Sequence, residues 1–484
     1  MRYLLILLLF PINALSQQFS PQEISRYEKQ AKNVTIIRDN WGVPHIYGKT
    51  DADAVFGLMY AQCEENFNQV EENNLEMLGR LSEKYGISEF YNDLQMQLIY
   101  DTSAAKKDYS KSLPWFRKLL DACADGVNYY LYKHPEVKPA IIFHFEPWFA
   151  LLRTDGSISA TQFGGLTVQD TRALFPLSNP TSFIPNEHAE PIIEPTGSNG
   201  FAIAPSRTKS KNAILYINPH VTFYFRTEVQ MVSEEGLNSY GAVTWGNFFV
   251  YQGFNEHCGW MHTSSYADVA DLYKEKSTIK GDSLFYEYDG RWIPATAKKI
   301  SVNYKENGQL KEQQYIAWST IHGPVLGLRN GVYLSLKENN RSLDALMQSW
   351  LRTKSKGFED FKRIMNMRSN NSNNTVFADD KGNIAYWHGN FMPRRDTKFD
   401  FGLPVDGSIS ATNWKGIHTL DEVVHVYNPA SGWIQNCNST PFTVAGESSP
   451  RKSSYPEYMA PDGQNFRALN AAKLLENAKN ISQD

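Results

Sequence analysis

The chain has 484 residues, of which 42% are hydrophobic and 21% are charged. This length and composition allow a large buried core and exclude a mainly disordered chain. The formal net charge is −4, and no basic stripe is interleaved with aromatic residues, so the sequence argues against a nucleic-acid partner.

The N-terminus, "MRYLLILLLFPINALSQQ", has a basic start, an apolar stretch and small residues near position 16. This pattern is typical of a secretory signal peptide covering residues 1–16 and cut before Gln17. The alternative is a membrane anchor, but the apolar run of about a dozen residues is short for a bilayer. No later segment has 18 apolar residues in a row. We therefore expect a periplasmic or secreted protein without a membrane span.

The first half of the chain is predicted to be mainly helical. Residues 34–47, "VTIIRDNWGVPHIY", read as a strand, a turn and a second strand. A helix follows from residue 51 to about 85, where apolar residues recur at a spacing of three and four and Asp51 can cap the start. A further helix is expected at 113–133.

Residues 174–197, "LFPLSNPTSFIPNEHAEPIIEPTG", contain five prolines and little periodicity, which predicts an exposed linker. Beyond it, short β-rich runs such as "FAIAPS", "AILYINP" and "NTVFADDKGNIAYWHGN" dominate. A helix-rich segment followed by a strand-rich segment favours an α+β fold over alternating βαβ units. The predicted organisation is therefore a signal peptide at 1–16, a helix-rich segment at 17–173, a linker at 174–197 and a strand-rich segment at 198–484.

Export makes disulfides possible, and four cysteines are present: Cys63, Cys123, Cys258 and Cys437. They form no C-x-x-C pair, so zinc binding is not expected. Three disulfide pairings are open, and so is the alternative of four buried thiols. His257 and His262 have no neighbouring set of metal ligands, and no P-loop or H-E-x-x-H motif occurs.

The strongest catalytic candidate is Ser198, directly after Gly197 at the end of the linker. A nucleophile elbow is excluded, because Thr196 stands where G-x-S-x-G requires glycine and a strand rather than a helix follows. A serine can also be activated as the first residue of a chain, because its α-amine has a pKa near 8 and serves as the base. This requires cleavage between Gly197 and Ser198, and glycine tolerates the strained backbone of such a step. Gly-Ser-Asn is also an ordinary turn sequence.

Four stretches resemble the penicillin acylase family of precursors. They are "VTIIRDNWGVPHIYGKTDADAVFGLMYAQ", "GSNGFAIAPSRTKSKNAILYINPH", "NTVFADDKGNIAYWHGNFMPRR" and "NPASGWIQNCNSTP". They occur in the family's order and span most of residues 34–440. The resemblance implies an N-terminal nucleophile hydrolase with a four-layer αββα sandwich, which cuts itself into an α chain and a β chain that stay together as a heterodimer.

By position, the resemblance implies a role for each of five residues. Ser198 matches the nucleophile, and His220 the residue that orients the serine and its amine. The backbone N–H of Ser264 and the side chain of Asn374 match the two donors to the oxyanion. Arg395 matches a buried arginine that supports this site. Each has an ordinary alternative, since His220 follows an Asn-Pro turn, Asn374 lies in an asparagine-rich run, and the match at Arg395 could slip to Arg394.

Asp268 and Asp271 match calcium-binding aspartates of some family members. Two carboxylates three residues apart are also common on a solvated loop, and calcium needs six or more oxygen ligands. Calcium would be structural, because the implied catalysis uses no cofactor.

The sequence thus predicts an exported, self-processing acylase that hydrolyses a small N-acyl amide, with acyl-homoserine lactones, β-lactam side chains or lipopeptides as candidate substrates. The aromatic run "NFFVYQGF" could line an acyl pocket or form sandwich core. Family precursors continue beyond the point where this chain stops, which suggests a fragment or a separately encoded part. The alternative function is therefore a truncated, inactive ligand-binding relative.

Overall fold

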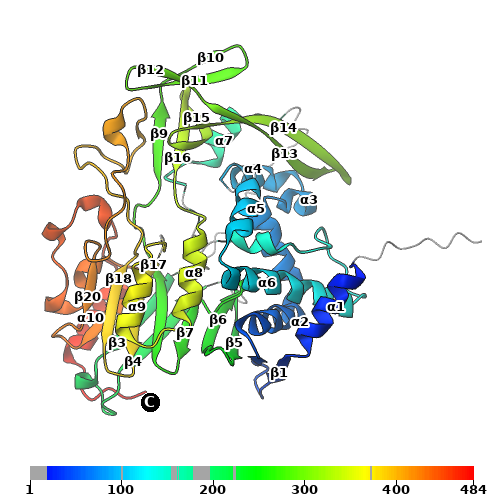
Figure 1. Ribbon diagram of the computed structural model, residues 1–484. Helices are drawn as coiled ribbons and strands as arrows, with labels where there is room; N and C mark the ends of the chain where they lie inside the picture. Colours follow the sequence, from blue (N-terminus) through cyan, green and yellow to red (C-terminus); the bar gives the residue numbers. More distant parts are fainter. Residues whose placement is uncertain are drawn as a thin grey trace, which may run out of the picture.

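A computed structural model describes residues 19–99, 102–153, 161, 163–177, 197–221, 225–370 and 373–483 (Figure 1). The predicted signal peptide and positions 178–196 of the predicted linker lie outside the described residues. At the described start of that linker, Phe175 and Leu177 are buried against Tyr91 and Val302, while Pro176 is exposed.

Helices make up most of the chain before residue 175, as predicted. The described helices are α1 (Pro21–Ala31), α2 (Asp51–Leu78), α3 (Leu81–Tyr85), α4 (Phe90–Ile99), α5 (Thr102–Lys111), α6 (Pro114–Lys133), α7 (Val168–Leu174), α8 (Leu343–Arg352), α9 (Phe358–Met365) and α10 (Phe466–Asn477).

The predicted helix from 51 to 85 is two helices with a different cap from the one expected. Thr50, not Asp51, caps α2, because its side chain accepts the N–H of Asp53 in a capping box. Asp51 instead binds Lys354 at 2.7 Å. The helix ends at Gly79, whose φ of 62° suits glycine in a left-handed C-cap.

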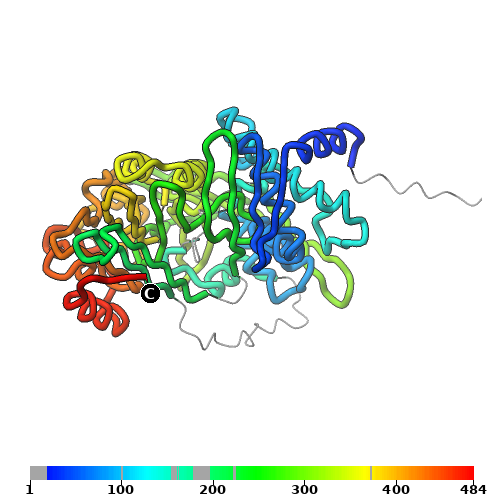
Figure 2. Tube along the Cα trace, turned by 90° about the horizontal axis from the view of Figure 1, so that it is seen from below, coloured from blue at the N-terminus to red at the C-terminus, as the bar shows by residue number. Residues whose placement is uncertain are grey.

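The largest sheet has nine strands in the order β1-β2-β5-β6-β7-β8-β17-β18-β20. Their bounds are β1 (Val34–Arg38), β2 (Pro44–Gly48), β5 (Arg226–Ser233), β6 (Asn238–Thr244), β7 (Gln252–Asn255), β8 (Cys258–Ser264), β17 (Asn373–Asp379), β18 (Ile384–His388) and β20 (His425–Tyr427). The hairpin predicted at 34–47 is confirmed as β1 and β2, and β2 joins β5 in parallel. Figure 2 shows this N-terminal hairpin beside the later strands.

A three-stranded sheet, in the order β21-β3-β4, packs on one face of the nine-stranded sheet. It consists of β21 (Trp433–Asn436), β3 (Gly197–Ile203) and β4 (Ile214–His220). Ala202 and Ile434 from the small sheet share a buried cluster with Met261, Val376 and Tyr386 from the large one. Every residue of β17 is buried, because a second apolar layer covers its opposite face.

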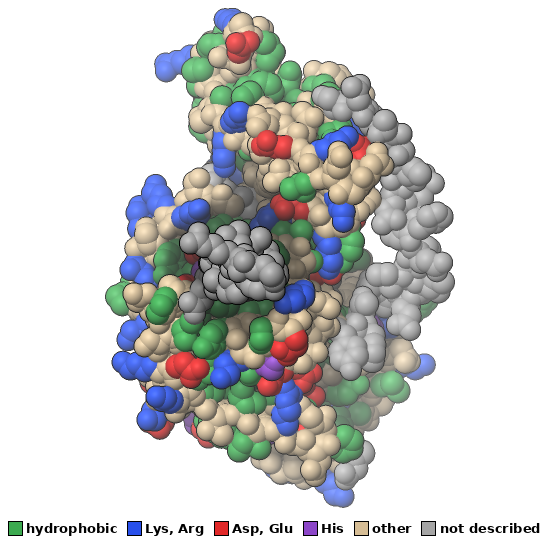
Figure 3. Space-filling view, turned by 90° about the vertical axis from the view of Figure 1, so that its right-hand side faces the viewer, with side chains coloured by type: hydrophobic (Ala, Val, Ile, Leu, Met, Phe, Trp, Pro, Cys, Tyr) green, Lys and Arg blue, Asp and Glu red, His purple; other side chains and the backbone are tan. Residues whose placement is uncertain are grey.

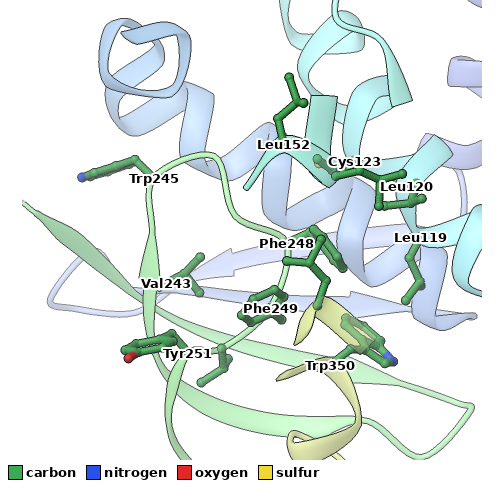
Figure 4. Packing of buried hydrophobic residues seen from close by; sticks show 14 of the residues in the cluster. Leu119, Leu120, Cys123, Leu152, Val243, Trp245, Phe248, Phe249, Tyr251 and Trp350 are labelled. Carbon is green, nitrogen blue, oxygen red and sulfur yellow. The ribbon is translucent and has the colours of Figure 1, made fainter. Parts of the chain in front are cut away.

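Helices α2, α6, α8 and α9 form that second layer (Figure 1). Residues 248–251 of the aromatic run at 247–254 belong to this core and are buried, whereas Phe254 is exposed. The ring of Phe248 contacts those of Phe116 of α6 and Trp350 of α8. Figure 4 shows Phe248, Phe249 and Trp350 in the surrounding cluster. The core interpretation is therefore confirmed for residues 248–251, which pack under the helices.

Two further sheets project from this layered body at the top of Figure 1. One has six strands in the order β13-β14-β15-β16-β9-β19, and the other has three in the order β10-β11-β12. Their bounds are β9 (Asp271–Glu275), β10 (Ser277–Lys280), β11 (Ser283–Tyr288), β12 (Arg291–Pro294), β13 (Thr296–Glu306), β14 (Gln309–Thr320), β15 (Gly323–Arg329), β16 (Val332–Lys337) and β19 (Val405–Asp406). The mixture of helices with largely antiparallel sheets confirms the α+β class.

The four cysteines are all buried free thiols, as one of the two alternatives predicted, and none of the three disulfide pairings is formed. Within the described ranges, none of the helices has the length and apolar character needed to cross a bilayer. Basic and acidic side chains are interspersed over the face shown in Figure 3.

Candidate active site

Ser198 occupies the second position of β3, the central strand of the small sheet. It pairs with Pro219 of β4 and is only 6% exposed. Side chains alternate along a strand, so Ser198 shares a face with Gly200 and Ala202. That face meets the large sheet, because a Cβ at Gly200 would come within 2.3 Å of Met261 Sδ. Ser198 is therefore directed between the two sheets.

Two side chains from the C-terminal part of the chain hold the backbone of Ser198. Its N–H donates to Asn438 Oδ1 at 2.5 Å, and its carbonyl oxygen accepts from Arg467 Nη1 at 3.0 Å. Arg467 Nη2 also donates to Asn438 Oδ1, at 3.1 Å. A Cβ at Gly197 would lie 2.6 Å from Asn438 Oδ1, so this close approach requires the glycine.

Asn438 is itself held in place by its neighbours. Its φ of 58° lies in the left-handed region, which asparagine adopts more readily than most residues. Its N–H donates to Asn436 Oδ1 at 3.0 Å, and its carbonyl accepts from Asn465, which caps α10. Figure 2 shows α10, in red, beside the strands that contain Ser198, in green.

Ser264 and Asn374 lie on neighbouring strands of the large sheet, β8 and β17. Asn374 Nδ2 donates to Ser264 O at 3.2 Å and to Thr263 Oγ1 at 3.0 Å. Asn438 Nδ2 donates to the same Ser264 carbonyl at 3.0 Å. Asn438 thus connects Ser198 to Ser264 and Asn374, and these three predicted residues meet where the two sheets face each other.

Asn374 is fully buried, and its amide nitrogen and amide oxygen contact different sets of hydrogen-bond partners. Nδ2 faces acceptors, including Asn436 Oδ1 at 3.3 Å. Oδ1 accepts from Tyr386 Oη at 2.5 Å and lies 2.7 Å from His388 Nδ1. Burial raises the pKa of Tyr386 well above its ordinary value, so the phenol keeps its proton for this contact. The orientation of the Asn374 amide is therefore fixed by its partners.

His220 ends β4 opposite Gly197, next to the Ser198 position. Its Nε2 lies 2.9 Å from Asn218 Oδ1 and 3.2 Å from Asn199 Nδ2. Among the described residues, its hydrogen bonds go to these two asparagines and none goes to Ser198. Any influence of His220 on the serine would pass through Asn199, which Arg467 also contacts at 2.7 Å.

Arg395 contacts a different group of residues from those around Ser198 and Asn374. Its Nε and Nη2 each lie 2.8 Å from a carboxylate oxygen of Asp271, and its Nη1 donates to Asp268 O at 2.7 Å. Asp268 Oδ1 is 3.3 Å from Arg395 Nη2. Burial raises the pKa of Asp268 to about 7. The predicted supporting arginine and the two predicted calcium ligands thus form one buried ion-pair cluster.

This arrangement does not fit a calcium ion. Both oxygens of Asp271 are used by Arg395, and Trp414 Nε1 also donates to one of them. A guanidinium already neutralises the carboxylates that would have to bind the cation. In the described part of the chain, no group of three or more His, Cys, Asp or Glu side chains is placed to hold a metal. We derive no role for calcium.

Sequence reasoning assigned no role to Asn436, Asn438 or Arg467. The block "NPASGWIQNCNSTP" contains both asparagines, so its resemblance to the family was the available signal. Arg467 gave no signal, because it lies 269 residues from Ser198 in the chain.

The chain is similar to several known proteins. An acyl-homoserine lactone acylase QuiP from Pseudomonas fluorescens strain Pf-5 is 26% identical over 84% of this chain and 56% of its own length. QuiP from Pseudomonas aeruginosa is 25% identical over 84% of this chain and 55% of its own length. Penicillin G acylase of Escherichia coli is 27% identical over 51% of this chain and 29% of its own length. The chain therefore spans about half the length of the curated relatives it matches.

Among solved structures, a thermostable penicillin G acylase from Alcaligenes faecalis matches with a TM-score of 0.46 and 22% identity. The match covers 58% of this chain and 52% of that one. The family model for penicillin amidase matches residues 33–484, which is most of the chain and includes every residue of the site. The chain belongs to the penicillin amidase family.

Proposed function

We propose that this chain forms the nucleophile-bearing part of an exported, self-processing acylase, an amidohydrolase that cleaves the amide of a small N-acyl compound. The observation that carries the proposal is the placement of Ser198. It is buried between two sheets, and Asn438 links its backbone N–H to Ser264 and, through the Ser264 carbonyl, to Asn374. Family membership supports the same chemistry.

The first step is self-cleavage. Ser198 Oγ attacks the carbonyl carbon of Gly197, the peptide C–N bond breaks, and the nitrogen becomes the free α-amine of Ser198. Water then hydrolyses the resulting ester, which releases the Gly197 carboxylate and restores the hydroxyl. Asn438 and Arg467 hold the Ser198 backbone on either side of the serine side chain. The two products remain associated as a heterodimer.

Amide hydrolysis uses the same serine. The α-amine takes the Oγ proton, directly or through a water, while Oγ attacks the substrate carbonyl. The developing oxyanion accepts from Asn374 Nδ2 and from the Ser264 N–H. The C–N bond breaks as the ammonium returns its proton to the leaving amine, and water hydrolyses the acyl-enzyme. To admit the oxyanion, Asn374 Nδ2 exchanges one of its present acceptors for the substrate oxygen.

The proposed substrates are N-acyl-homoserine lactones, with β-lactam antibiotics as the second class. Relatives named for each of these activities match the chain. Cleavage of either would degrade a quorum-sensing signal or an antibiotic. The complete enzyme is proposed to have the four-layer αββα sandwich, of which the described residues contribute a helical layer and the two facing sheets. The N-terminal apolar segment favours a periplasmic or secreted location.

Self-cleavage is tested by replacing the nucleophile. Ser198→Ala is expected to leave one uncut chain, because the hydroxyl that attacks Gly197 is gone. The wild type is expected to give two fragments, the larger starting at Ser198. Denaturing gel electrophoresis and N-terminal sequencing of the larger fragment measure both outcomes.

Maturation of the Ser198→Ala chain to a new N-terminus at residue 198 would rule out intramolecular attack by this serine. Ser206→Ala is a matched control, because Ser206 lies in the short turn after the same strand and is expected to leave cleavage unchanged. A wild-type chain that stays uncut and hydrolyses no acyl amide would instead support the inactive ligand-binding alternative.

A further inference from the structure

Behind Asn374 lies a buried histidine–aspartate pair to which neither the sequence nor the proposed mechanism gives a role. His388 ends β18, directly opposite Asn374 in the strand register. Asp462 lies in the connection before α10. Both side chains are fully buried, and His388 Nε2 is 3.2 Å from Asp462 Oδ2. The other carboxylate oxygen of Asp462 accepts the N–H of Tyr266 at 2.9 Å.

The contacts of the two ring nitrogens fix the protons of His388. Nδ1 lies 2.7 Å from Asn374 Oδ1, and an amide oxygen can only accept, so Nδ1 donates. Nε2 faces a carboxylate, and a lone pair there would meet a negative charge in a buried place. The contact lies within ion-pair distance but is not directed as a hydrogen bond. A proton on each ring nitrogen makes the ring a cation, which pairs with the buried charge of Asp462 at ion-pair distance.

We propose that the Asp462–His388 pair is a positioning device for the oxyanion donor Asn374. This inference rests on the proposed function, because it assumes that Asn374 Nδ2 meets the oxyanion. A 180° turn of the Asn374 amide would place its NH₂ group against the proton on His388 Nδ1 and its oxygen against the Ser264 carbonyl. The pair therefore holds Nδ2 toward the small sheet, where Ser198 lies.

The pair also strengthens the donor. A cationic ring that donates to the amide oxygen draws electron density from the amide nitrogen, so the Nδ2 hydrogens bind an anion more tightly. The site lies in a buried environment, where such effects are larger than in water. Asp462 keeps the ring charged and fixes its rotation. His388 and Asp462 thus act on the reaction through Asn374 and do not touch the substrate.

The protonation of His388 can be measured without any catalytic activity. The full chain labelled with ¹⁵N-histidine is expected to show, at neutral pH, a doubly protonated ring signal that disappears in His388→Gln and therefore belongs to His388. Asp462→Asn should convert the ring to the neutral form. A neutral His388 in the wild type, with Nδ1 unprotonated, would overturn the proposal.

Kinetics test the effect on the reaction. His388→Gln is expected to lower kcat about 10- to 100-fold with little change in KM, because a hydrogen bond to a charged group is lost. In an Asn374→Ala background the same change should cost nothing further, because His388 acts only through Asn374. A full additional loss in the double variant, or a loss confined to KM, would overturn the positioning role.

The chain offers a matched control in His322. It is also fully buried and pairs with a buried carboxylate, Glu275, at 2.9 Å, in the sheet that carries β9. His322→Gln removes an equivalent pair away from Asn374, so kcat should be unchanged in the folded variant. A loss as large as that of His388→Gln would show that any buried ion pair has this effect.

Failure of this inference can be distinguished from failure of the proposed function. If Asn374→Ala keeps full activity, the oxyanion role itself is wrong, and the positioning role falls with it. If Asn374→Ala loses kcat and His388→Gln does not, the positioning role alone is wrong. If the wild type hydrolyses no acyl amide, the proposed function fails, and the histidine protonation still decides whether the pair is charged.

Discussion

At the scale of single residues, the site is dominated by asparagine side chains. Asn374, Asn436 and Asn438 all lie at the junction of the two sheets, and each both donates and accepts. A neutral amide can satisfy a backbone N–H on one side and a carbonyl on the other without adding charge to a buried place. This suits a site in which a negative charge forms only during the reaction.

The role of Asn374 can be tested by removing its amide. Asn374→Ala is expected to permit self-cleavage but to lower kcat about 10²–10³-fold, because the donor acts mainly on the transition state. Substrate binding, measured as KM under conditions of slow chemistry, should change little. Steady-state kinetics on the purified, matured protein check both values. A loss seen only in KM would remove Asn374 from the oxyanion role.

Asn438 can be tested without disturbing its backbone. Asn438→Gly keeps the left-handed conformation at φ of 58° but removes the acceptor of the Ser198 N–H. A buried donor without a partner is costly, so self-cleavage should slow about 10-fold or more. The cleavage rate is measured from gel time courses.

Asn330→Gly is the control for Asn438→Gly, because Asn330 has a φ of 51° in an exposed turn between β15 and β16. It should cleave at the wild-type rate. Equal cleavage rates for Asn438→Gly and the wild type would show that Asn438 does not help to position the serine.

At the scale of elements, ion pairs and caps join segments that do not pair as strands. Arg395 lies between β18 and β19 and binds Asp271 at the start of β9. The cap of α10, Asn465, donates to the carbonyls of Cys437 and Asn438 just after β21. These contacts fix the segment between β18 and β19 and the loop after β21.

The Arg395 cluster is expected to be structural. Arg395→Leu leaves the Asp271 carboxylate buried and unpaired, so the free energy of unfolding should fall by about 3–5 kcal/mol. Arg394→Leu is the control, because Arg394 pairs with the exposed Glu422 and its loss should leave the free energy of unfolding almost unchanged. Urea unfolding followed by tryptophan fluorescence measures both.

The same measurement with a calcium chelator is expected to leave the wild-type unfolding midpoint unchanged, since Arg395 already occupies both carboxylate oxygens of Asp271. A clear drop in stability on chelation, restored by calcium, would contradict this reading of the cluster.

At the scale of the whole molecule, the two facing sheets determine what the chain can do. The small sheet brings Ser198, and the large sheet brings Ser264 and Asn374, so the site exists only where the sheets pack together. The apolar residues between the sheets, such as Met261 and Ala202, hold this junction closed. Residues 248–251 of the aromatic run are packed in the helix-covered core.

Substrate preference depends on the whole molecule, because residues from several helices and strands together line an acyl pocket. For the proposed substrate class, each buried methylene contributes about 0.8 kcal/mol. We therefore expect kcat/KM to rise with acyl length for N-acyl-homoserine lactones and to exceed the value for penicillin G under the same conditions. A preference for penicillin G, or no dependence on acyl length, would contradict this expectation and leave the acylase chemistry intact.

Much of the local structure was readable from the sequence. The hairpin at 34–47, the helices beginning at 51 and near 113, and the strand that carries Ser198 follow from periodicity and turn residues. The turn at Lys381, Gly382 and Asn383 likewise placed Asn374 on a hairpin strand. These features depend on neighbours within a few residues, so they leave a local pattern. The start of α2 was misassigned because Thr50 and Asp51 are both good caps.

The tertiary structure alone decided which groups surround the serine. Asn438 reaches Ser198 from 240 residues away, and Arg467 from 269, and contacts at such separations leave no periodicity in the sequence. The partners of Arg395 were also not readable from the sequence, which suggested that Asp268 and Asp271 bind calcium and not a guanidinium. A sequence pattern determines which face of a strand is apolar. Only the packing of one sheet on another decides which polar side chains meet at the junction, because that depends on how the whole chain is arranged in space.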